Sequence, residues 1–397
     1  MSIIVTYSGV HQAFLHAGAA SQAGELESFL CSLYDAPGKW GRRLSKVLGA
    51  SALVNRSSPD IAPSKVVEFP WPMIKHRLNQ RLLPRFAGDW LAANEKFDSW
   101  SARKILNSNA RLVVATETCA RDSIKAARER GALSLLDCPQ VHPDFLTSLF
   151  ASAGQDLECD VPMKFDTPAM DARKREEFKS ADHLLTISQI QANSFIEAGI
   201  PESKISTISL GIDSDFWRGG KHFQKQSGPL RILFVGGICL RKGIPYLLKA
   251  VEMLGNQAEL WLVGPNSGEV DNFLSNASVS IKFLGRKNKI ELRDLYRAAD
   301  VFVLPSLIDT FGFVGMEAMA AGTPTIVTDN CGVPVPDSSW RVPVMNADAL
   351  ASRLTEYIIN PRLLADHSEK ASLFAKSHNR QWYQDQVSQL FGHLMEQ

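Results

Sequence analysis

The sequence predicts an α/β protein of two domains, each built on a parallel sheet that helices cover. Strand-like and helix-like segments alternate along most of the 397 residues, which is the pattern of parallel strands joined by helical crossovers. The length suits two domains of ordinary size. A polar, glycine-containing stretch, Arg218–Gly228, is the best linker candidate. The expected division is an N-terminal domain over residues 1–210, a C-terminal domain over 229–378 and a final segment over 379–397.

The N-terminal domain is expected to begin with a strand at the first apolar run of the chain. Its clear strands are predicted at Ile3–Tyr7, Leu112–Thr116, Ala132–Leu136 and His183–Ile187. The charged segment Arg173–Ser180 is predicted to be helical. Ser188 is expected to cap a helix over Gln189–Ala198, because serine side chains commonly bond the free N–H groups at a helix start.

The C-terminal domain is expected to repeat the same alternation. Its predicted elements are strand Arg231–Val235, helix Pro245–Leu254, strands Glu259–Val263 and Ser280–Leu284, helix Lys289–Ala298, a buried strand within Ala299–Pro305, a small-residue helix Glu317–Ala321 and strand Pro324–Thr328. The last segment, Arg380–Met395, carries apolar residues at helical spacing and indicates an amphipathic helix.

Composition and charge exclude several classes of protein. A hydrophobic content of 45% and 21% charged residues are typical of a globular protein, and a net charge of +1 gives no argument for nucleic acid. The six cysteines show no metal-ligand spacing, which favours reduced thiols over disulfides or zinc. The opening residues indicate a strand rather than a signal peptide, and no apolar run reaches the ~18 residues of a membrane span. We therefore expect a cytoplasmic protein.

The most informative segment is Ser306–Ile326, which reads SLIDTFGFVGMEAMAAGTPTI. It places Asp309 after a buried strand and Glu317 at the start of a helix, with Phe311, Gly312 and Phe313 between them. Acidic side chains at such positions face the ligand crevice of an open α/β sheet. Carboxylates accept hydrogen bonds from vicinal hydroxyls, and the free N–H groups of a glycine turn bind phosphate or sugar oxygens. Sugar hydroxyls together with a diphosphate indicate a nucleotide sugar.

This segment resembles the E-x7-E signature of retaining GT-B glycosyltransferases of the family 4 type, the glycosyl transferases group 1. The similarity extends upstream through Glu291–Ser306, is strong from about Ala181 onward and is weak before it. It implies two Rossmann-like domains whose parallel sheets face across a cleft. It also implies an acceptor-binding N-terminal domain, a nucleotide-sugar-binding C-terminal domain and a last helix that crosses back to the former. The chain departs from the family pattern at Asp309, where Glu is usual, and at Thr310, where Gly is usual.

A second candidate site follows the strand Arg231–Val235. A glycine turn and then Arg241 and Lys242 at a helix start are suited to a diphosphate, through backbone donors and a point charge. The family pattern V-G-R-x-x-x-x-K-G implies that Lys242 neutralises the leaving diphosphate, but Gly237 stands where the family has Arg. Arg241 is the candidate for the missing charge, although neighbours on a helix point in different directions. The alternative for both cations is a solvated surface position.

Further glycine turns match the family at lower specificity. Gly264 corresponds to a turn near the nucleotide base and Gly285-Arg286 to the loop that brackets it. For both turns a scaffold role is favoured over a specific contact. In the N-terminal domain, Gly9 follows the first strand where the family has a glycine-rich loop that lets the donor diphosphate approach the backbone. The adjacent His11 is either functional or only a helix-entry residue.

The loop Leu136–Pro143 contains the other catalytic candidate. The resemblance implies a His here that donates to a hydroxyl of the transferred sugar, and His142, or failing that Asp137, fits this role. A structural His beside a proline is the alternative. Glu117 and Thr118 end the preceding strand in the same way and are candidates for acceptor contacts.

Residues 39–90 combine basic and aromatic side chains with few acids. Such a mixture on amphipathic segments suits an anionic membrane surface, and the alternative is a solvated helical face with ordinary core aromatics. The residues that make up this region are Lys39, Trp40, Arg42, Arg43, Lys46, Trp71, Lys75, His76, Arg77, Arg81, Arg85, Phe86 and Trp90.

The sequence therefore predicts a retaining glycosyltransferase that moves a sugar from a UDP- or GDP-linked donor to a carbohydrate or lipid-linked acceptor in polysaccharide or glycolipid assembly. Glu317 is expected to hold the ribose, Asp309 the donor sugar, and Lys242 the leaving diphosphate. No metal or cofactor is expected, because basic side chains take the place of Mg²⁺. Two alternatives stay open: a GT-B epimerase or phosphorylase, and an inactive GT-B binding subunit, which the residues Gly237 and Asp309 favour.

Overall fold

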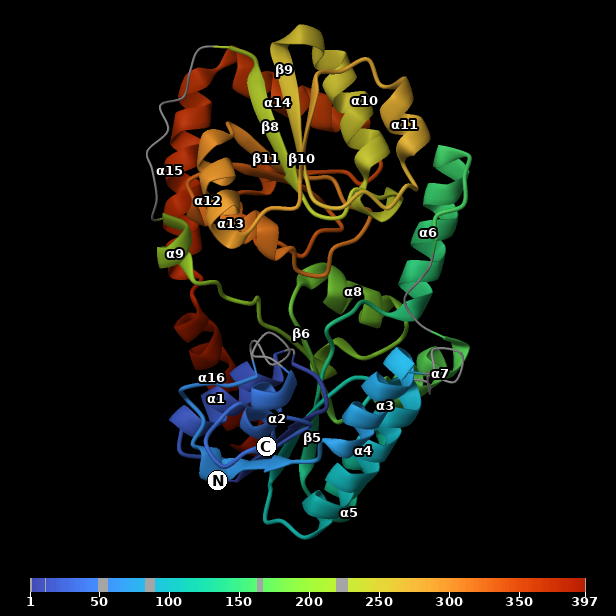
Figure 1. Cartoon of the computed structure of the whole chain (residues 1–397), viewed down its shortest axis with the longest axis vertical. Helices are drawn as coiled ribbons and strands as arrows, with labels where there is room; N and C mark the ends of the chain where they lie inside the picture. The colour runs from blue at the N-terminus through green and yellow to red at the C-terminus, as the bar shows by residue number, and fades with distance from the viewer. Residues whose placement is uncertain are drawn as a thin grey trace.

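The computed structural model describes residues 2–10, 12–48, 56–82, 90–162, 167–218 and 228–396. They form two parallel sheets stacked along the long axis of the molecule, each surrounded by helices (Figure 1). The seven strands of the N-terminal sheet are β1 Ile3–Tyr7, β2 Leu26–Cys31, β3 Val66–Glu68, β4 Leu112–Thr116, β5 Leu133–Asp137, β6 His183–Thr186 and β7 Ile205–Thr207. The six of the C-terminal sheet are β8 Leu230–Val235, β9 Ala258–Val263, β10 Ile281–Gly285, β11 Val301–Leu304, β12 Thr325–Thr328 and β13 Arg341–Val342. The predicted pair of parallel α/β domains is confirmed.

Helices connect the strands in both domains. Those of the N-terminal half are α1 Ala13–Gln22, α2 Trp40–Leu48, α3 Trp71–Leu82, α4 Trp90–Leu106, α5 Arg121–Glu129, α6 Pro143–Leu157, α7 Pro168–Ser180 and α8 Gln189–Glu197. Those of the C-terminal half are α9 Ser214–Arg218, α10 Ile244–Leu254, α11 Asp271–Asn276, α12 Lys289–Ala298, α13 Phe313–Ala320, α14 Ala347–Ile359, α15 Pro361–Ser377 and α16 Arg380–Glu396. A 3₁₀ turn, η5 Leu240–Lys242, precedes α10.

The two sheets share one topology. Their strand orders are β3-β2-β1-β4-β5-β6-β7 and β10-β9-β8-β11-β12-β13. In each sheet the order reverses beside the first strand, between β1 and β4 in one and between β8 and β11 in the other. Ligands of open α/β sheets bind outside the carboxyl ends of the strands at such a reversal. The topology therefore marks the segments after β1, β4, β8 and β11 as the places to look for a site.

The central strands are buried because they are almost wholly apolar. Every residue of β1, β4 and β11 is buried, as expected for parallel strands with both faces covered. The small residues of α13 allow this helix to pack closely, and five of its eight residues are buried. The loops that follow β8 and β11 are therefore attached to a rigid core.

The carboxyl edges of the two sheets face each other. Val141, which follows β5, belongs to one buried apolar cluster with Leu307 and Ile308, which follow β11. Gly332, after β12, is so close to Ser188, after β6, that an added Cβ would lie 2.6 Å from the Ser188 Cβ. Helix α6 rises from the N-terminal domain along the side of the C-terminal domain (Figure 1). Its Asp156 accepts a hydrogen bond of 2.6 Å from the Tyr246 hydroxyl on α10.

The two chain crossings between the domains run side by side. The Ile212 N–H donates to the His378 carbonyl at 3.0 Å, and Gly211 leaves no room for a Cβ because the Asn379 carbonyl oxygen would be 2.0 Å away. After this crossing α16 packs against α1, where the Tyr383 hydroxyl lies 2.8 Å from the His16 Nε2. Both ends of the chain lie at the N-terminal domain (Figure 1).

Some elements differ from the sequence expectations. Strands β2, β3, β7 and β13 are not predicted, since β2 includes polar residues and the other three have two or three residues each. Helix α13 begins at Phe313 rather than at Glu317, so Glu317 lies in its second turn. Asp137 ends β5 and does not lie in the loop after it. Of the predicted linker, residues 219–227 lie outside the described residues.

Candidate functional site

The acidic loop after β11 brings two predicted site residues into contact. The Lys242 ammonium, at the end of η5, donates to Asp309 Oδ2, and the two side chains are 13% and 17% exposed. The loop is fixed on both sides, because the Leu307 N–H donates to the Arg241 carbonyl at 2.9 Å and the Gly332 N–H to the Asp309 carbonyl at 2.7 Å. A cation and a carboxylate thus lie together at the topological reversal of the C-terminal sheet.

Gly312 begins α13 in a conformation that favours glycine. Its φ is +76°, and an added Cβ would lie 2.6 Å from a methyl group of Val333. The Gly315 N–H donates to the Gly312 carbonyl at 2.9 Å. No side chain caps the preceding N–H groups of Phe313 and Val314, so these two can bond a ligand oxygen. Phe311 is buried, Phe313 is 49% exposed, and their rings are 4.7 Å apart.

Glu317 is half-buried, and a tyrosine from α12 holds it. The Tyr296 hydroxyl donates to Glu317 Oε2 at 3.0 Å. Burial raises the pKa of Glu317, while the Tyr296 hydrogen bond and the charge of Lys289 lower it. Tyr296 is not among the residues predicted for the site, although it lies within the family-like segment ELRDLYRAAD.

The glycine turns after β8 and β9 lie against each other. The φ of Gly264 is +138°, and an added Cβ would be 1.8 Å from the Gly236 carbonyl oxygen, so only glycine fits. Gly237 differs, since the nearest atom to an added Cβ is the Cys239 sulfur at 4.0 Å. A Cβ therefore has room at Gly237. The Arg241 guanidinium lies 3.4 Å from the Ile308 carbonyl oxygen, one residue before Asp309.

The N-terminal loop after β1 is tightly packed. A Cβ on Gly9 would lie 2.4 Å from the Tyr7 ring, so the ring covers this glycine. The neighbouring Ser8 hydroxyl donates to the Asn94 side chain at 2.8 Å. His11 lies outside the described residues.

His142 caps a helix in this structure. Its Nδ1 accepts the Asp144 N–H at 3.3 Å at the start of α6, and its ring lies 5.7 and 5.8 Å from those of Phe178 and Phe195. The residue is 6% exposed, and burial lowers its pKa against the raising effect of Asp144. A structural role thus accounts for the contacts of this side chain, and its sugar-binding role stays a prediction.

The carboxylates at the N-terminal edge are engaged within the protein. Thr116 donates to Asp137 at 3.2 Å, and burial raises the pKa of Asp137 to about 7. Glu117 lies 3.3 Å from the Lys174 ammonium, and both are buried. Thr118 has a φ of +71° and donates its N–H to a carboxylate oxygen of Glu177 at 2.6 Å.

Helix α5 is capped by two buried carboxylates that the sequence analysis does not identify. Glu177 accepts the Ala120 and Arg121 N–H groups at 2.9 and 3.1 Å, and Asp98 accepts those of Asp122 and Ser123 at 2.8 and 3.0 Å. Arg173 bonds both carboxylates, at 3.1 Å to Glu177 and 2.6 Å to Asp98. The four-residue spacing of Arg173 and Glu177 on one helix is the sequence signal that points to this pair.

The basic and aromatic region of the N-terminal domain is partly described. The Trp40 and Trp71 rings are 5.3 Å apart, both are exposed, and the Arg43 guanidinium lies 5.3 Å from the Trp40 ring. A groove of about 550 Å³ beside Trp71 is lined by apolar residues, by Glu95 and by four cations, namely Lys75, Lys96, Arg103 and Arg121. Nothing is described of the side chains of Lys46, Arg77, Arg81, Arg85 and Phe86.

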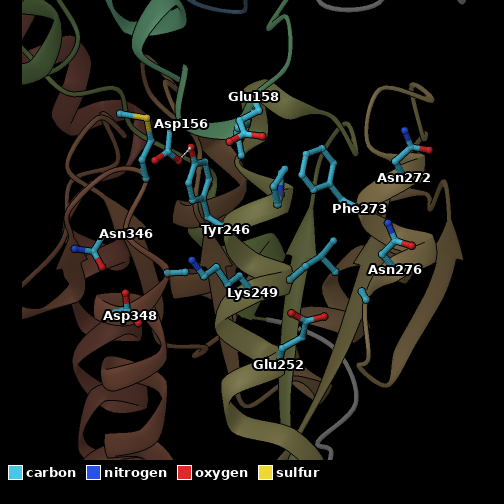
Figure 2. A pocket seen from close by; sticks show the side chains of 16 residues that line it. Asp156, Glu158, Tyr246, Lys249, Glu252, Asn272, Phe273, Asn276, Asn346 and Asp348 are labelled. Atoms are coloured by element: carbon cyan, nitrogen blue, oxygen red, sulfur yellow. Dashed lines mark hydrogen bonds between the residues drawn. The ribbon is translucent and has the colours of Figure 1, made fainter. Parts of the chain in front are cut away.

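A cavity of about 800 Å³ lies outside the predicted site. It is open to the surface and is bordered by the end of α6, by α10 and α11 and by the start of α14 (Figure 2). Tyr246 and Asp156 meet at one end of it, and Lys249 and Glu252 lie along α10. No predicted site residue lines this cavity.

Within the described ranges, no three His, Cys, Asp or Glu side chains are grouped so that they could hold a metal ion. Likewise, none of the helices in those parts of the chain is long and apolar enough to cross a membrane.

Residues 229–360, which contain the loops after β8 and β11, match the family model of the glycosyl transferases group 1. The match covers about a third of the chain and lies within the C-terminal domain. The chain is 35% identical over 149 residues to an uncharacterized glycosyltransferase of Methanocaldococcus jannaschii, which covers 34% of this chain and 38% of the relative. It is 30% identical over 198 residues to the putative colanic acid biosynthesis glycosyltransferase WcaL of Salmonella typhimurium, 45% of this chain and 48% of the relative.

The chain thus spans less than half the length of these two relatives. In structure it aligns over its full length with Anabaena HepE in complex with UDP, covering 100% of both chains with a TM-score of 0.61 and 15% identity. A likeness at this identity concerns the fold, and the predicted GT-B fold is confirmed.

Proposed function

We propose that the protein transfers a sugar, with retention of configuration, from a nucleoside diphosphate to a hydroxyl acceptor. The observation that carries this proposal is the group 1 domain with Lys242, Asp309, Glu317 and the open start of α13 at the carboxyl edge of one sheet. Support for a nucleoside diphosphate comes from the bound UDP of HepE, whose fold this chain shares. Support for a role in polysaccharide assembly comes from the name of the WcaL relative.

The roles follow from the chemistry of the groups. Glu317 accepts hydrogen bonds from the ribose hydroxyls, and Asp309 accepts them from the donor sugar. The N–H groups at the start of α13 and the Lys242 ammonium bind the diphosphate, whose negative charge grows as the bond to the sugar breaks. Because the ammonium is bonded to Asp309 before the donor arrives, a bound diphosphate shares this cation with the carboxylate.

In the proposed reaction the bond between the anomeric carbon and the diphosphate oxygen breaks, and a bond to the acceptor oxygen forms on the same face. The acceptor proton passes to the departing phosphate oxygen, so the products are a nucleoside diphosphate and a glycosylated acceptor. Asp309 and Glu317 act here as donor-binding groups. A retaining glycosidase instead places two carboxyl groups across the anomeric carbon.

The test is thermal unfolding of the wild type and Glu317→Ala with UDP-, GDP- and ADP-sugars in the absence of added metal. A ligand that binds the folded chain raises the melting temperature. We expect a rise with one nucleotide, absent in Glu317→Ala, and slow hydrolysis of that donor without acceptor. Donor binding without hydrolysis or transfer would favour an inactive binding subunit, for which Gly237 in place of Arg is the supporting observation. Isomerised donor, or phosphate dependence, would favour an epimerase or phosphorylase.

We further propose that Trp40, Trp71 and the cations around them contact an anionic membrane that carries the acceptor. Indole rings and basic side chains exposed on one surface are suited to the lipid headgroup region. Co-sedimentation with vesicles of phosphatidylglycerol is expected to weaken in Trp71→Ser and in raised salt. Equal binding to neutral vesicles would contradict the proposal.

A further inference from the structure

Tyr296 is hydrogen-bonded to one of the two carboxylate oxygens of Glu317. The tyrosine is fully buried on α12, and its hydroxyl donates to Oε2 at 3.0 Å. A phenol donates a single proton, so this bond directs one oxygen of Glu317 into the protein. The carboxylate therefore meets any ligand in one fixed orientation.

Aromatic rings on two sides hold Tyr296 in place. Its ring lies 5.6 Å from that of Trp217 at an angle of 76° and 5.8 Å from that of Phe302 at 70°. Both are edge-to-face contacts, which are favourable for aromatic pairs. Its backbone is held as well, because the Thr323 hydroxyl donates to the Tyr296 carbonyl at 2.5 Å. The phenol has little freedom to turn away from Glu317.

Trp217 belongs to α9, the first helix after the chain crosses from the N-terminal domain. The same helix provides Phe216, whose ring centre lies 4.1 Å from the Lys289 ammonium, and Trp217 lies 5.3 Å from that ammonium. Lys289 is the cation whose charge acts on Glu317. Helix α9 thus supports both groups that act on this carboxylate.

We propose that Tyr296, backed by Trp217, is a positioning residue that makes the site selective for ribonucleotides over deoxyribonucleotides. With Oε2 bonded to the phenol, Oε1 faces the ribose. The two vicinal ribose hydroxyls then donate to a carboxylate that does not rotate. A nucleotide that lacks one hydroxyl leaves a partly buried charge without a donor. This inference rests on the proposed role of Glu317 in nucleotide binding.

The test is calorimetric titration with UDP, GDP and ADP and with the 2′-deoxy form of whichever binds. A hydrogen bond to a charged group contributes enough that we expect the wild type to favour the ribonucleotide by about tenfold or more. In Tyr296→Phe this ratio is expected to fall to about threefold, and in Glu317→Ala to about one. The matched control is Tyr357→Phe, which removes another buried hydroxyl of the same domain, bonded to His367 at 2.8 Å, and should leave the ratio unchanged.

The outcomes separate the inference from the proposed function. If the wild type binds none of the nucleotides, both fail. If the wild type discriminates and Glu317→Ala does not, but Tyr296→Phe keeps the full ratio, the positioning role is overturned while the role of Glu317 stands. Should Tyr296→Phe not fold, Trp217→Phe carries the same test, and an unchanged ratio in a folded Trp217→Phe overturns the inference.

Discussion

The two sheet edges that face each other carry similar charged groups, but these groups differ in exposure and in what they bond. At the C-terminal edge, Lys242, Asp309 and Glu317 are partly exposed beside the start of α13, which no side chain caps. At the N-terminal edge, the side chains of Arg173, Asp98 and Glu177 are 2%, 0% and 0% exposed, and the carboxylates accept backbone N–H groups of α5. A charged cluster at a strand end is therefore evidence for a binding site only where the protein leaves its groups open to a ligand.

The first prediction tests whether the N-terminal cluster is structural. Arg173→Met leaves Asp98 and Glu177 buried without their cation, and breaking a buried ion pair in this way costs about 3–5 kcal/mol of unfolding free energy. Urea denaturation measures the loss. The control is Arg175→Met, two residues along α7, which removes an exposed pair with Asp144 at 2.7 Å and should cost under about 1 kcal/mol. A stable Arg173→Met protein that has lost transfer activity would show instead that this cluster binds a ligand.

The second prediction concerns pH and Asp137. Burial raises the pKa of this carboxyl to about 7, above its value of about 3.9 in the unfolded chain. The folded state therefore binds the proton more tightly, and the stability that this group contributes is full below pH 4 and is lost as the pH rises toward 7. Each unit corresponds to at most about 1.4 kcal/mol.

Asp137→Asn removes this titration, so its stability relative to the wild type should increase between pH 4 and pH 7. Denaturant unfolding of both proteins across that range is the measurement. A constant difference would contradict the assignment. If Asp137→Asn is stable at pH 7 but has lost sugar transfer, Asp137 contacts the substrate, as the alternative to His142 requires.

The third prediction addresses the C-terminal edge. Lys242→Met removes the cation proposed to bind the leaving diphosphate, and loss of one such electrostatic contact is expected to lower kcat by about a hundredfold. Stability should change little, because the Asp309 carboxylate that loses its partner is near the solvent. The control is Lys249→Met on α10, which lines the cavity outside the site and should keep full activity (Figure 2). Equal kcat for the two variants would remove Lys242 from the mechanism.

The two edges also differ in how much of their structure can be predicted from the sequence. Asp309, Lys242 and Gly312 are predicted from the sequence as site residues because they belong to local motifs, in which a strand end, a glycine turn and a helix start follow in fixed order. The contact between Lys242 and Asp309 cannot be predicted in this way, because the ion pair joins segments 67 residues apart along the chain.

The N-terminal edge is assembled from long-range contacts without a motif. Glu177 caps a helix that begins more than fifty residues earlier, and nothing local to Glu177 indicates this. The residue type of His142 fits two roles, because a ring that suits a sugar hydroxyl also suits a helix cap. The structure shows the cap, and the sugar-binding role stays a prediction. In both cases the type of residue is visible in the sequence, and the partner it meets is decided by the fold.

The smallest expected effect comes from restoring the family arginine. In Gly237→Arg the first side-chain atom fits, since an added Cβ meets no atom closer than the Cys239 sulfur at 4.0 Å. A second cation near Lys242 should bind the diphosphate more strongly in the transition state, and we expect kcat/KM to rise by up to about tenfold. Gly237→Met adds length without charge and should give no increase. If Gly237→Arg is no faster, Arg241 already provides the charge, and Arg241→Met must then lower kcat as Lys242→Met does. If neither variant changes kcat, one cation is sufficient at this site, and the departure from the family pattern at Gly237 has no catalytic cost.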